Sequence, residues 1–415
     1  MSDWTWIIYL AGDNNLEGAG YDDLKEMQEI GSSDRLNLIV QFDTEVGGAT
    51  RYRVERNALS TVQKMPGVNT GRPETLSEFI SWAMKKYPAK HYLLDVWNHG
   101  GGWENLPADF NYDGLRAGKP LREARLQRLK RSIFRTTAEH VLALPEAPSP
   151  ASSGRARRGP GRRAIAIDTG SHDYLDNQEL QRAVSKAFGA AKADILGCDA
   201  CLMNMLEIAY EMRATSQFMV GSEETEPAAG WPYASVLKQL AATPAMSPSD
   251  LAKLIVREYR GWYDKNGSAS DGAATQSAFD LSKIDQAVAA LDDLAGALTS
   301  ELSSVAGAVS LALAGAQKFR YPEYVDLGSF ASQLVKKLPA RAKSRAPANA
   351  LLKVLANNDF VVANATWGDS AKRATGVTVY FPKPEEYSPD YDQLELSQNA
   401  KWMPFLKAFN AAAVE

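Results

Sequence analysis

The sequence predicts an α/β protein with a mostly parallel sheet and helices on its faces. The alternation of its segments predicts this class, and composition and length limit the chain to an ordinary globular protein of several domains or one large unit. Apolar runs of strand length alternate with segments of helical periodicity through the first hundred residues, and turn residues close most of these runs. The 415-residue chain is 45% hydrophobic and 23% charged, as in ordinary globular proteins. At roughly 150 residues per domain, this length predicts two to three domains, or one large unit with additions.

The first hundred residues are expected to form three buried strands separated by two helices. The strands are residues 4–12, 36–42 and 91–97, and the helices are residues 21–30 and 73–87. This order favours parallel strands, whose carboxyl ends meet at the edge where ligands bind in such sheets. The polar residues that follow the three runs, Asp13, Asp43 and His99, are therefore expected on the side of a site.

A basic insertion is expected at about residues 116–163. This stretch holds thirteen Lys and Arg residues against three Glu residues, and its second half is rich in Pro, Ser, Gly and Arg. Such a composition cannot bury a core, so we expect an exposed and mobile segment. Apolar residues within Arg122–Arg135 indicate a basic helix there. A surface loop with no role is the simpler alternative, although loops of this length are usually functional or disordered.

Regular structure is expected to resume at Ala164. Residues 164–168, 193–197 and 217–221 are expected strands, and residues 177–188 are an expected helix. A further helix is expected to start at Cys201, because several apolar residues after it share one helical face. These are Leu202, Met205, Leu206, Ala209 and Tyr210.

The chain is expected to divide near residue 245. Residues 1–245 would form the sheet domain, and residues 246–415 a helical, α+β lobe packed on it. Apolar residues from Ile284 to Val309 recur at steps of three and four, which predicts helix packing. Strand-like runs follow at residues 360–363 and 376–381.

Composition excludes several classes of function. A net charge of -4 argues against a nucleic-acid partner, and two cysteines cannot build a disulfide framework. No apolar run approaches the ~18 residues of a membrane span. The N-terminus lacks the basic region of a signal peptide, so a cytoplasmic location is expected, with export by another route left open. The oligomeric state is not predicted.

A thiol and an imidazole follow two of the expected strands. His99-Gly100 follows the run 91–97, and Cys201 follows the run 193–197. A neighbouring His can generate the reactive thiolate or protonate a leaving group. The expected helix start at Cys201 would favour the thiolate further. The N–H groups of Gly100 and Cys201 could hold an oxyanion. A buried Cys and a hydrogen-bonded core His remain the alternative for this pair.

Two other classes compete. Cys198 and Cys201 form a Cys-x-x-Cys motif at a strand end, as in thiol–disulfide oxidoreductases. That class would leave His99-Gly100 unexplained and places its motif early in a short fold. We therefore expect Cys198 to be a core residue. An inactive, peptidase-shaped binding protein is the third class, and the presence of both reactive residues argues against it. A zinc site lacks further ligands.

Longer motifs resemble the clostripain-like cysteine peptidases, in the clan of caspases, gingipains and legumains. The matching segments are WTWIIYLAGDNNLE, LLDVWNHGGGW, DTGSHDYLDNQEL, LGCDACLMNMLEIAYE and VGSEETEPAAGWPY, in this order over most of residues 4–240. The resemblance implies a caspase-like three-layer α/β sandwich. It also implies a cysteine endopeptidase that cleaves after Arg, and less strongly after Lys, in peptides and proteins.

The resemblance also implies roles for single residues. His99 matches the catalytic histidine, Cys201 the nucleophile and Gly100 the oxyanion-hole residue. Asp199 matches an acidic residue in the pocket for the side chain on the acyl side of the cleaved bond. A helix cap is the alternative for Asp199. Glu223 and Glu226 are further candidates for that pocket. No third catalytic residue is named, and Asn98 is expected only to shape the turn.

Self-cleavage and calcium complete the expectations. Members of this family often cut themselves into two chains, and a protease specific for Arg would cut an Arg-rich, flexible insertion readily. The favoured sites are Arg155, Arg157, Arg158, Arg162 and Arg163, with Arg122–Arg135 as a second region. No cofactor is required by the sequence. Some relatives need calcium, and Asp109, Asp113 and Asp173 lack EF-hand spacing, so a calcium requirement is left open.

Overall fold

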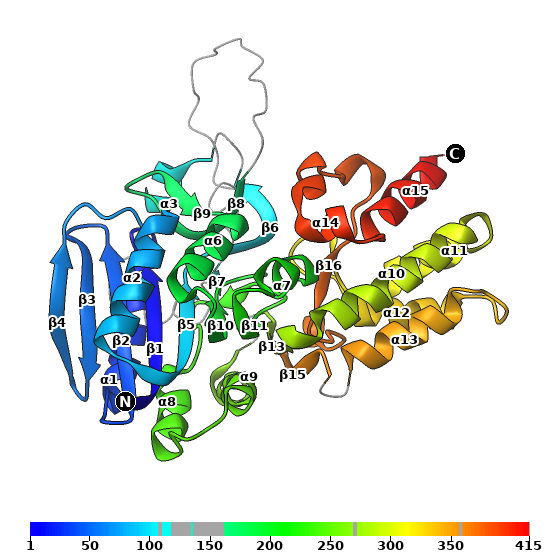
Figure 1. The fold of residues 1–415 in the computed structure, drawn as a ribbon. Helices are drawn as coiled ribbons and strands as arrows, with labels where there is room; N and C mark the ends of the chain where they lie inside the picture. The colour runs from blue at the N-terminus through cyan, green and yellow to red at the C-terminus, as the bar shows by residue number, and fades with distance from the viewer. Residues whose placement is uncertain (107–109, 118–133, 136–161, 269–271, 357–358, 415) are drawn as a thin grey trace, which may run out of the picture. The chain divides into compact units, whose positions relative to one another are not determined.

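The computed structural model describes the chain except residues 107–109, 118–133, 136–161, 269–271, 357–358 and 415 (Figure 1). The chain divides into two compact units. The first comprises Met1–Ala191, Asp199–Cys201 and Glu226–Ala245. The second comprises Lys192–Cys198, Leu202–Thr225 and Met246–Glu415. The chain therefore passes between the units several times, and one of these passages lies at the expected division near residue 245.

The first unit is built on five strands in the order β5-β1-β2-β3-β4. The strands are β1 (Ser2–Ala11), β2 (Leu36–Thr44), β3 (Gly48–Glu55), β4 (Ala58–Met65) and β5 (Ala89–Trp97). Strand β1 pairs in parallel with both β2 and β5, which confirms the three expected buried strands. Strands β3 and β4 extend the edge as an antiparallel hairpin that the sequence did not predict.

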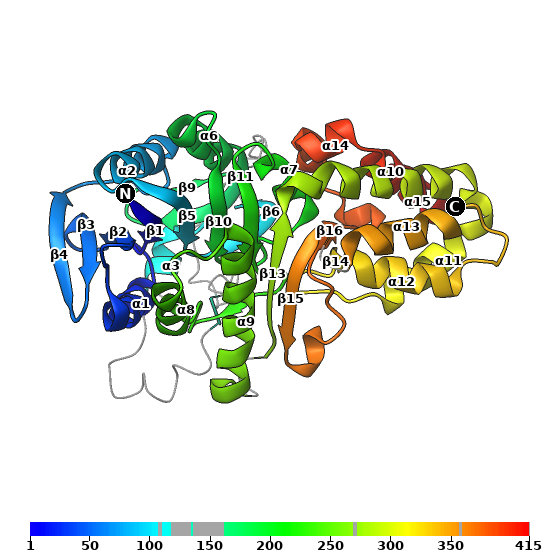
Figure 2. The same ribbon diagram turned by 60° about the horizontal axis from the view of Figure 1, so that its bottom comes forward.

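Helices cover both faces of this sheet and give three layers. They are α1 (Glu17–Ile30), α2 (Pro73–Lys86), α6 (Asn177–Phe188) and α8 (Tyr233–Ala242). Figure 2 shows α2 and α6 together on one face, and α1 and α8 on the other. Helix α6 starts where predicted because Asp176 and Glu179 form a reciprocal capping box. The α/β class and the layered architecture expected from the sequence are confirmed.

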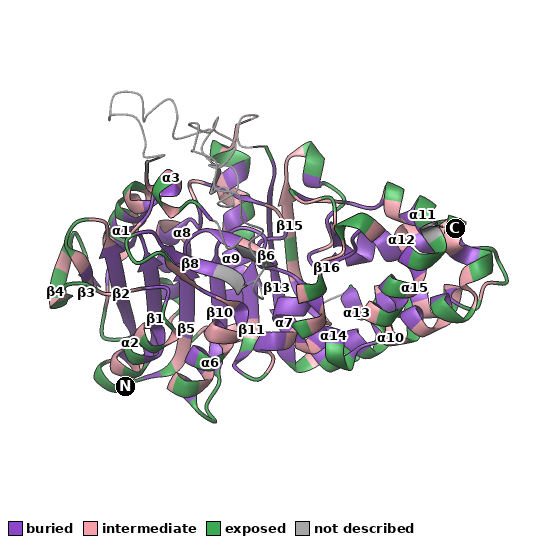
Figure 3. Cartoon of the chain, turned by 90° about the horizontal axis from the view of Figure 1, so that it is seen from above, coloured by how far each residue is buried: buried purple, intermediate pink, exposed green. Residues whose placement is uncertain are grey.

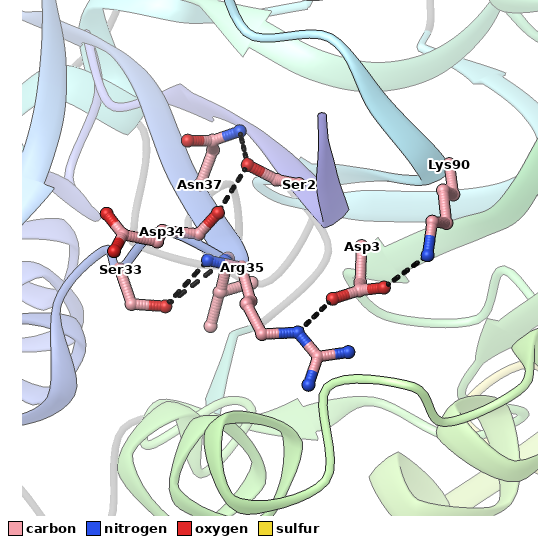
Figure 4. A network of polar contacts seen from close by, with 8 residues as sticks. Ser2, Asp3, Ser33, Asp34, Arg35, Asn37 and Lys90 are labelled. Atoms are coloured by element: carbon pink, nitrogen blue, oxygen red, sulfur yellow. Dashed lines mark hydrogen bonds and ion pairs between the residues drawn. The ribbon is translucent and has the colours of Figure 1, made fainter.

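Strand β1 is fixed at its amino end by a charged network (Figure 4). The Asp3 carboxylate accepts from Arg35 Nε at 2.5 Å and from Lys90 Nζ at 3.0 Å. Arg35 directly precedes β2, and Lys90 lies at the start of β5. These two cations lower the pKa of Asp3 to about 2. The network therefore aligns the starts of the three parallel strands.

A small antiparallel sheet lies beyond the carboxyl ends of β1 and β5. It contains β6 (Gly100–Leu106), β8 (Arg162–Asp168) and β9 (Asp173–Leu175), and the short helix α3 (Tyr112–Ala117) follows β6. Gly100, Gly101 and Gly102 therefore belong to a strand. Regular structure resumes at Arg162, two residues before the expected Ala164.

Part of the basic stretch is ordered as a strand. Residues Phe134–Arg135 form β7, which pairs with β12 (Glu226–Pro227). Most of the expected helix within Arg122–Arg135 falls on residues up to 133, which the structure does not describe. The last two residues of that range, Phe134 and Arg135, form a strand and not a helix.

The second unit carries four strands in the order β15-β13-β11-β10. They are β10 (Ala193–Asp199), β11 (Ser216–Gly221), β13 (Ala274–Asp280) and β15 (Val361–Trp367). Strands β10 and β11 are parallel, whereas β13 and β15 are antiparallel. Helix α9 (Pro248–Asn266) packs on β11, β13 and β15.

Helices dominate the rest of the second unit, as expected. They are α7 (Leu206–Met212), α10 (Ile284–Ser300), α11 (Leu302–Gly315), α12 (Leu327–Lys337), α13 (Arg345–Leu355), α14 (Glu395–Asn399) and α15 (Trp402–Val414). The periodic segment from Ile284 to Val309 is two helices, because the chain breaks at Glu301. Two short strands, β14 (Tyr324–Asp326) and β16 (Thr378–Tyr380), pair beside them.

Buried residues concentrate in the strands. Figure 3 shows the central strands almost entirely in the buried colour, while the outer helix faces and β4 are largely exposed. Residues 3–11 of β1 are all buried, as a strand covered on both faces requires. Within the described part of the chain, no helix combines the length and apolarity needed to cross a membrane.

Candidate active site

The site begins where β5 and β10 end. Asn98 follows the last residue of β5, and its N–H donates to the carbonyl of Asp199, the last residue of β10, at 3.4 Å. His99 therefore lies one residue beyond this hydrogen bond on one strand, and Cys201 lies two residues beyond it on the other. The structure brings these two chain segments together, as expected for residues that follow parallel strands.

Asn98 fastens the turn that carries His99. Its side-chain amide donates to the carbonyl of Ala11 at the end of β1. Its Oδ1 accepts from the N–H of Ile167 at 3.0 Å and from the N–H of His99 at 2.6 Å. A buried amide with these partners holds a single orientation. The expected role of Asn98 in shaping the turn is confirmed.

The His99 ring is oriented by Asn15, which the sequence did not single out for this role. His99 Nε2 lies 2.7 Å from Asn15 Oδ1, in the loop after β1. An amide oxygen only accepts, so this contact assigns the proton to Nε2 in the neutral ring. Nδ1 is then the ring atom that can exchange a proton elsewhere. Asn15 stands where a third residue that orients the catalytic base is expected.

Cys201 lies in a turn and not at the start of a helix. Helix α7 begins at Leu206, so the expected helix from Cys201 is wrong, and with it the expected contribution of a helix dipole to the thiolate. The turn passes through Leu202 with φ 62°, a left-handed conformation that interrupts the helical pattern. A different donor serves the sulfur: the N–H of Glu226 lies 3.2 Å from Cys201 Sγ. A donated N–H favours the thiolate.

Gly100 lies directly against the main chain of Cys201. A Cβ added at Gly100 would lie 2.2 Å from the Cys201 carbonyl oxygen and 3.1 Å from its nitrogen. Real Cβ atoms do not approach a main chain so closely, so only glycine fits here. Gly100 therefore lets the segment after His99 touch the main chain of Cys201, a contact that the sequence did not predict.

Asp199 is a buried residue at the end of β10, held by a tyrosine. Its Oδ2 accepts from the hydroxyl of Tyr233 at 2.9 Å and from the N–H of Trp231 at 3.5 Å. The same hydroxyl lies 2.9 Å from Oδ2 of Asp95, a buried residue of β5. No helix begins at Asp199, so the alternative of a helix cap is wrong. The sequence did not identify Tyr233 or Asp95.

The two glutamate candidates lie in different surroundings. Glu226 is buried and adjoins Cys201 through its N–H. Glu223 belongs to the second unit, where its carboxylate accepts from the N–H of Gly376 at 2.9 Å and the hydroxyl of Thr378 at 3.1 Å. Burial, together with the nearby Asp326 carboxylate, raises the pKa of Glu223 well above its usual value. These contacts favour a structural role for Glu223, whereas Glu226 stays a candidate for the site.

The expected self-cleavage residues divide between two regions. Arg155, Arg157 and Arg158 lie outside the described residues. Arg162 and Arg163 lie in β8, opposite Leu106 and Asn105 of β6. These last two are therefore part of a paired strand, contrary to the expectation that they lie in an unstructured tract.

The thiols and the acidic loops bear on the remaining expectations. Cys198 and Cys201 are both buried thiols that form no disulfide, and Cys198 is the core residue that the sequence predicted. Among the loop acids, Asp113 contacts His172 at 3.5 Å and Asp173 accepts from Asn69 at 2.8 Å. Asp109 lies outside the described residues. Within the ranges that the structure describes, no group of three or more His, Cys, Asp or Glu residues is arranged to hold a metal ion.

Known proteins share this sequence pattern and this fold. The model of the clostripain family matches residues 8–112 and 153–409. Clostripain from Hathewaya histolytica is 24% identical over 349 residues, which is 72% of this chain. The chain spans 56% of the length of that relative.

Two solved structures share the fold over nearly their whole length. One is a secreted C11 cysteine protease from Bacteroides thetaiotaomicron in complex with an irreversible peptide inhibitor. It is 20% identical, has a TM-score of 0.63, and the match covers 98% of this chain and 99% of that one. The other is an inactive zymogen C11 protease from Parabacteroides distasonis, 19% identical with a TM-score of 0.63, matched over 96% and 99% of the two chains.

The fold places this protein in the structural class of the C11 cysteine proteases. Within that class, the chain belongs to the clostripain family, because the family model matches most of its length. The family resemblance expected from the sequence is confirmed.

Proposed function

We propose that the chain is a cysteine endopeptidase that cleaves after Arg, and less readily after Lys, with Cys201 as nucleophile and His99 as acid and base. The main support is the contact of Gly100 with the Cys201 peptide, which brings the segment carrying the imidazole to the thiol. The N–H of Glu226 lies beside Sγ and the Asn15 oxygen lies beside the ring, so each of the two buried side chains has a partner that holds it.

The proposed reaction follows the general scheme of nucleophilic catalysis. The Cys201 thiolate attacks the carbonyl carbon of the substrate and forms a carbon–sulfur bond. The N–H groups of Gly100 and Cys201 stabilise the negative charge on the carbonyl oxygen. The bond to the leaving nitrogen breaks as His99 gives that nitrogen a proton. Water, deprotonated by His99, then hydrolyses the thioester and restores the thiol.

The preference for Arg rests on acidic groups around the nucleophile. Asp199 lies two residues before Cys201, and Glu226 is the buried acidic residue whose main-chain N–H lies 3.2 Å from the Cys201 sulfur. A guanidinium can form two parallel hydrogen bonds with one carboxylate, whereas a Lys ammonium cannot match that geometry. Membership of the clostripain family agrees with this preference, which the sequence resemblance implies.

Turnover of peptides separates this proposal from the oxidoreductase and from a binding protein. We expect the purified chain to hydrolyse a fluorogenic peptide ending in Arg, and Cys201→Ala to lose that activity. Cys198→Ser is the matched control, because it removes the neighbouring thiol, and it should retain activity. Reduction of insulin disulfides that depends on Cys198 would support the oxidoreductase instead. Tight binding of an Arg peptide without turnover would support a binding protein.

The proposed chemistry uses only groups of the chain and no cofactor. The calcium requirement left open by the sequence is tested by assaying the same peptide with EDTA and with added calcium. Equal rates are expected if no ion is needed. Activity that disappears in EDTA and returns with calcium would assign the ion a role in the folded enzyme.

Self-cleavage in the basic stretch is part of the proposal. A protease specific for Arg acts most easily on Arg residues that reach its own active site in an extended conformation. The stretch at about residues 116–163 contains eleven arginines, of which Arg155, Arg157 and Arg158 stay the favoured sites.

A further inference from the structure

The loop after β1 is held by a second buried asparagine, Asn14. It directly precedes Asn15, whose side-chain oxygen contacts the His99 ring, and its own side chain is fully buried. Asn14 Oδ1 accepts from the N–H of Leu16 at 2.9 Å. Side-chain bonds of this kind close a tight turn around the residue between donor and acceptor. Asn14 therefore fixes the main chain of the residue that orients the imidazole.

The Asn14 amide shares its acceptors with Asn98. Asn14 Nδ2 donates to the carbonyl of Ala11 at 2.9 Å and to the carbonyl of Ile167 at 2.8 Å. Asn98 Nδ2 donates to the same two oxygens, and its distance to the Ile167 oxygen is 3.4 Å. An amide nitrogen has two N–H groups and a carbonyl oxygen has two lone pairs, so donors and acceptors match in number. The loop after β1 and the turn after β5 are thus fastened to the same two carbonyl groups.

One of these carbonyl groups belongs to a distorted part of β8. Ala166 has φ 58°, a left-handed conformation that costs energy in a residue with a Cβ. The register of β8 against β9 shifts across this residue. Such bulges change the direction of main-chain groups and are frequent beside active sites. The next residue, Ile167, donates its N–H to Asn98 Oδ1 at 3.0 Å and offers its carbonyl to Asn14, so both of its main-chain groups serve the two amides.

We propose that Asn14 is a positioning residue of the proposed reaction, which acts through Asn15 to fix the proton of His99 on Nε2. This inference rests on the proposed function and adds a residue that does not itself touch the reacting atoms. Because Asn14 and Asn98 bind common acceptors, the loop cannot move relative to the turn unless buried hydrogen bonds break. When Asn14 is removed, the Asn15 oxygen is no longer held at the ring.

The kinetics of Asn14→Ala with an Arg-ended fluorogenic peptide test the proposal. We expect kcat to fall by about 10-fold or more with KM within about twofold of the wild type, because the ring is misplaced while the Asp199 pocket is intact. Asn37→Ala is the matched control. Asn37 is a buried residue of β2 whose amide donates to Ser2 and Thr5, at the opposite end of the sheet (Figure 4). This control should lower the Tm and leave kcat unchanged.

A double-variant cycle distinguishes positioning from general damage to the site. If Asn14 acts through Asn15, adding Asn14→Ala to Asn15→Ala should lower kcat by no more than about twofold further. Effects on kcat that multiply in full would show that Asn14 acts by another route, and the inference would be wrong. Circular dichroism at the assay temperature establishes that each variant is folded.

Asn14→Ser keeps the inference testable if Asn14→Ala does not fold. Its hydroxyl can still accept from the N–H of Leu16, but it has one proton to donate where the amide has two. We expect a smaller fall in kcat than in Asn15→Ala, again with KM unchanged. A folded Asn14→Ser variant with the kcat of the wild type would overturn the proposal.

The same peptide assay separates this inference from the proposed function. If the wild type hydrolyses the peptide and Asn14→Ala does so with an equal kcat, only the inference is wrong and the peptidase stands. If the folded wild type does not hydrolyse the peptide, the proposed function fails and the inference fails with it.

Discussion

Asn15 determines which nitrogen of His99 carries the proton in the neutral ring. Its amide oxygen lies 2.7 Å from Nε2, from a loop 84 residues earlier in the chain. Neither residue type nor spacing reveals this partnership, because it depends on β1 and β5 lying side by side. The sequence predicted His99, Gly100 and Cys201 from strand ends and family motifs, but the residues that orient them needed the folded chain.

Replacing Asn15 tests this orientation. In Asn15→Ala the ring loses its acceptor, and we expect kcat to fall by about 10²-fold with little change in KM, as for a misplaced catalytic group. Asn15→Asp keeps an acceptor, so activity should be largely restored. Its negative charge favours the protonated ring, so the acidic limb of the pH–rate profile should move to higher pH. Unchanged kcat in Asn15→Ala would show that the contact is dispensable.

Tyr233 joins two buried carboxylates with a single hydroxyl. Removing it in Tyr233→Phe takes away the 2.9 Å partner of both Asp95 and Asp199. We expect the free energy of unfolding to fall by about 1–3 kcal/mol, because a buried carboxylate oxygen loses its hydrogen-bond donor. The preference for Arg over Lys peptides should fall as well, since Asp199 loses its anchor. Tyr21→Phe, at an exposed tyrosine, should change neither quantity.

Asp43 makes stability depend on pH near neutrality. Burial, together with the carboxylates of Asp168 and Asp13, raises the pKa of Asp43 to about 8. An unfolded Asp titrates near 4, so between pH 4 and 8 the folded chain holds a proton that the unfolded chain has lost. Stability from this group is therefore present at low pH and declines as pH rises toward 8.

Denaturant unfolding at pH 6 and at pH 8 tests this direction of the pH dependence. From pH 6 to pH 8 the free energy of unfolding of the wild type should fall by roughly 2 kcal/mol because of Asp43. Asp43→Asn stays uncharged and should show a smaller loss over the same interval. Some dependence should remain, because burial also raises the pKa of Glu207 to about 7. If Asp43→Asn loses as much free energy of unfolding between pH 6 and pH 8 as the wild type, groups other than Asp43 cause the pH dependence.

At the scale of elements, the parallel strands were predictable and the antiparallel edge was not. Strands β1, β2 and β5 are covered on both faces, so they appear in the sequence as continuous apolar runs. Strand β4 is largely exposed and carries polar residues, so no apolar pattern marks it. Around Cys201 the helical spacing of apolar residues was misleading, because the left-handed Leu202 delays the helix to Leu206.

The charged network of Figure 4 predicts a dependence on pH and salt for the starts of the strands. Asp3 has a pKa lowered to about 2 by Arg35 and Lys90. Its contribution to stability is therefore present above pH 4 and is lost as the pH falls toward 2. Asp3→Asn should lower the Tm at pH 7, and 1 M NaCl should reduce the difference by screening. Asp34→Asn, at an exposed neighbour, should have no such effect.

At the scale of the whole molecule, each of the two units is built from three separate segments of the chain. Strand β11 belongs to the second unit and pairs with β13, although β11 precedes Ala245 and β13 follows it. A protein truncated after Ala245 would leave the edge of β11 uncovered. Uncovered apolar edges promote aggregation. We expect that fragment to be insoluble or oligomeric by size-exclusion chromatography, and a soluble, folded monomer would contradict this expectation.

The pairing of β6 with β8 determines the fate of the molecule if the chain is cut in the basic stretch, as the proposed function expects. A cut between Arg122 and Arg158 places β6 and β8 in different pieces, although these strands pair, and it also separates helices α2 and α6, which pack together. A nicked molecule would thus remain one particle with two strands of polypeptide in a common core. Unfolding would let the two polypeptides diffuse apart. Refolding would then require the two pieces to meet again, so its rate would depend on protein concentration. Recovery would then fall on dilution for the nicked form and stay constant for the intact one.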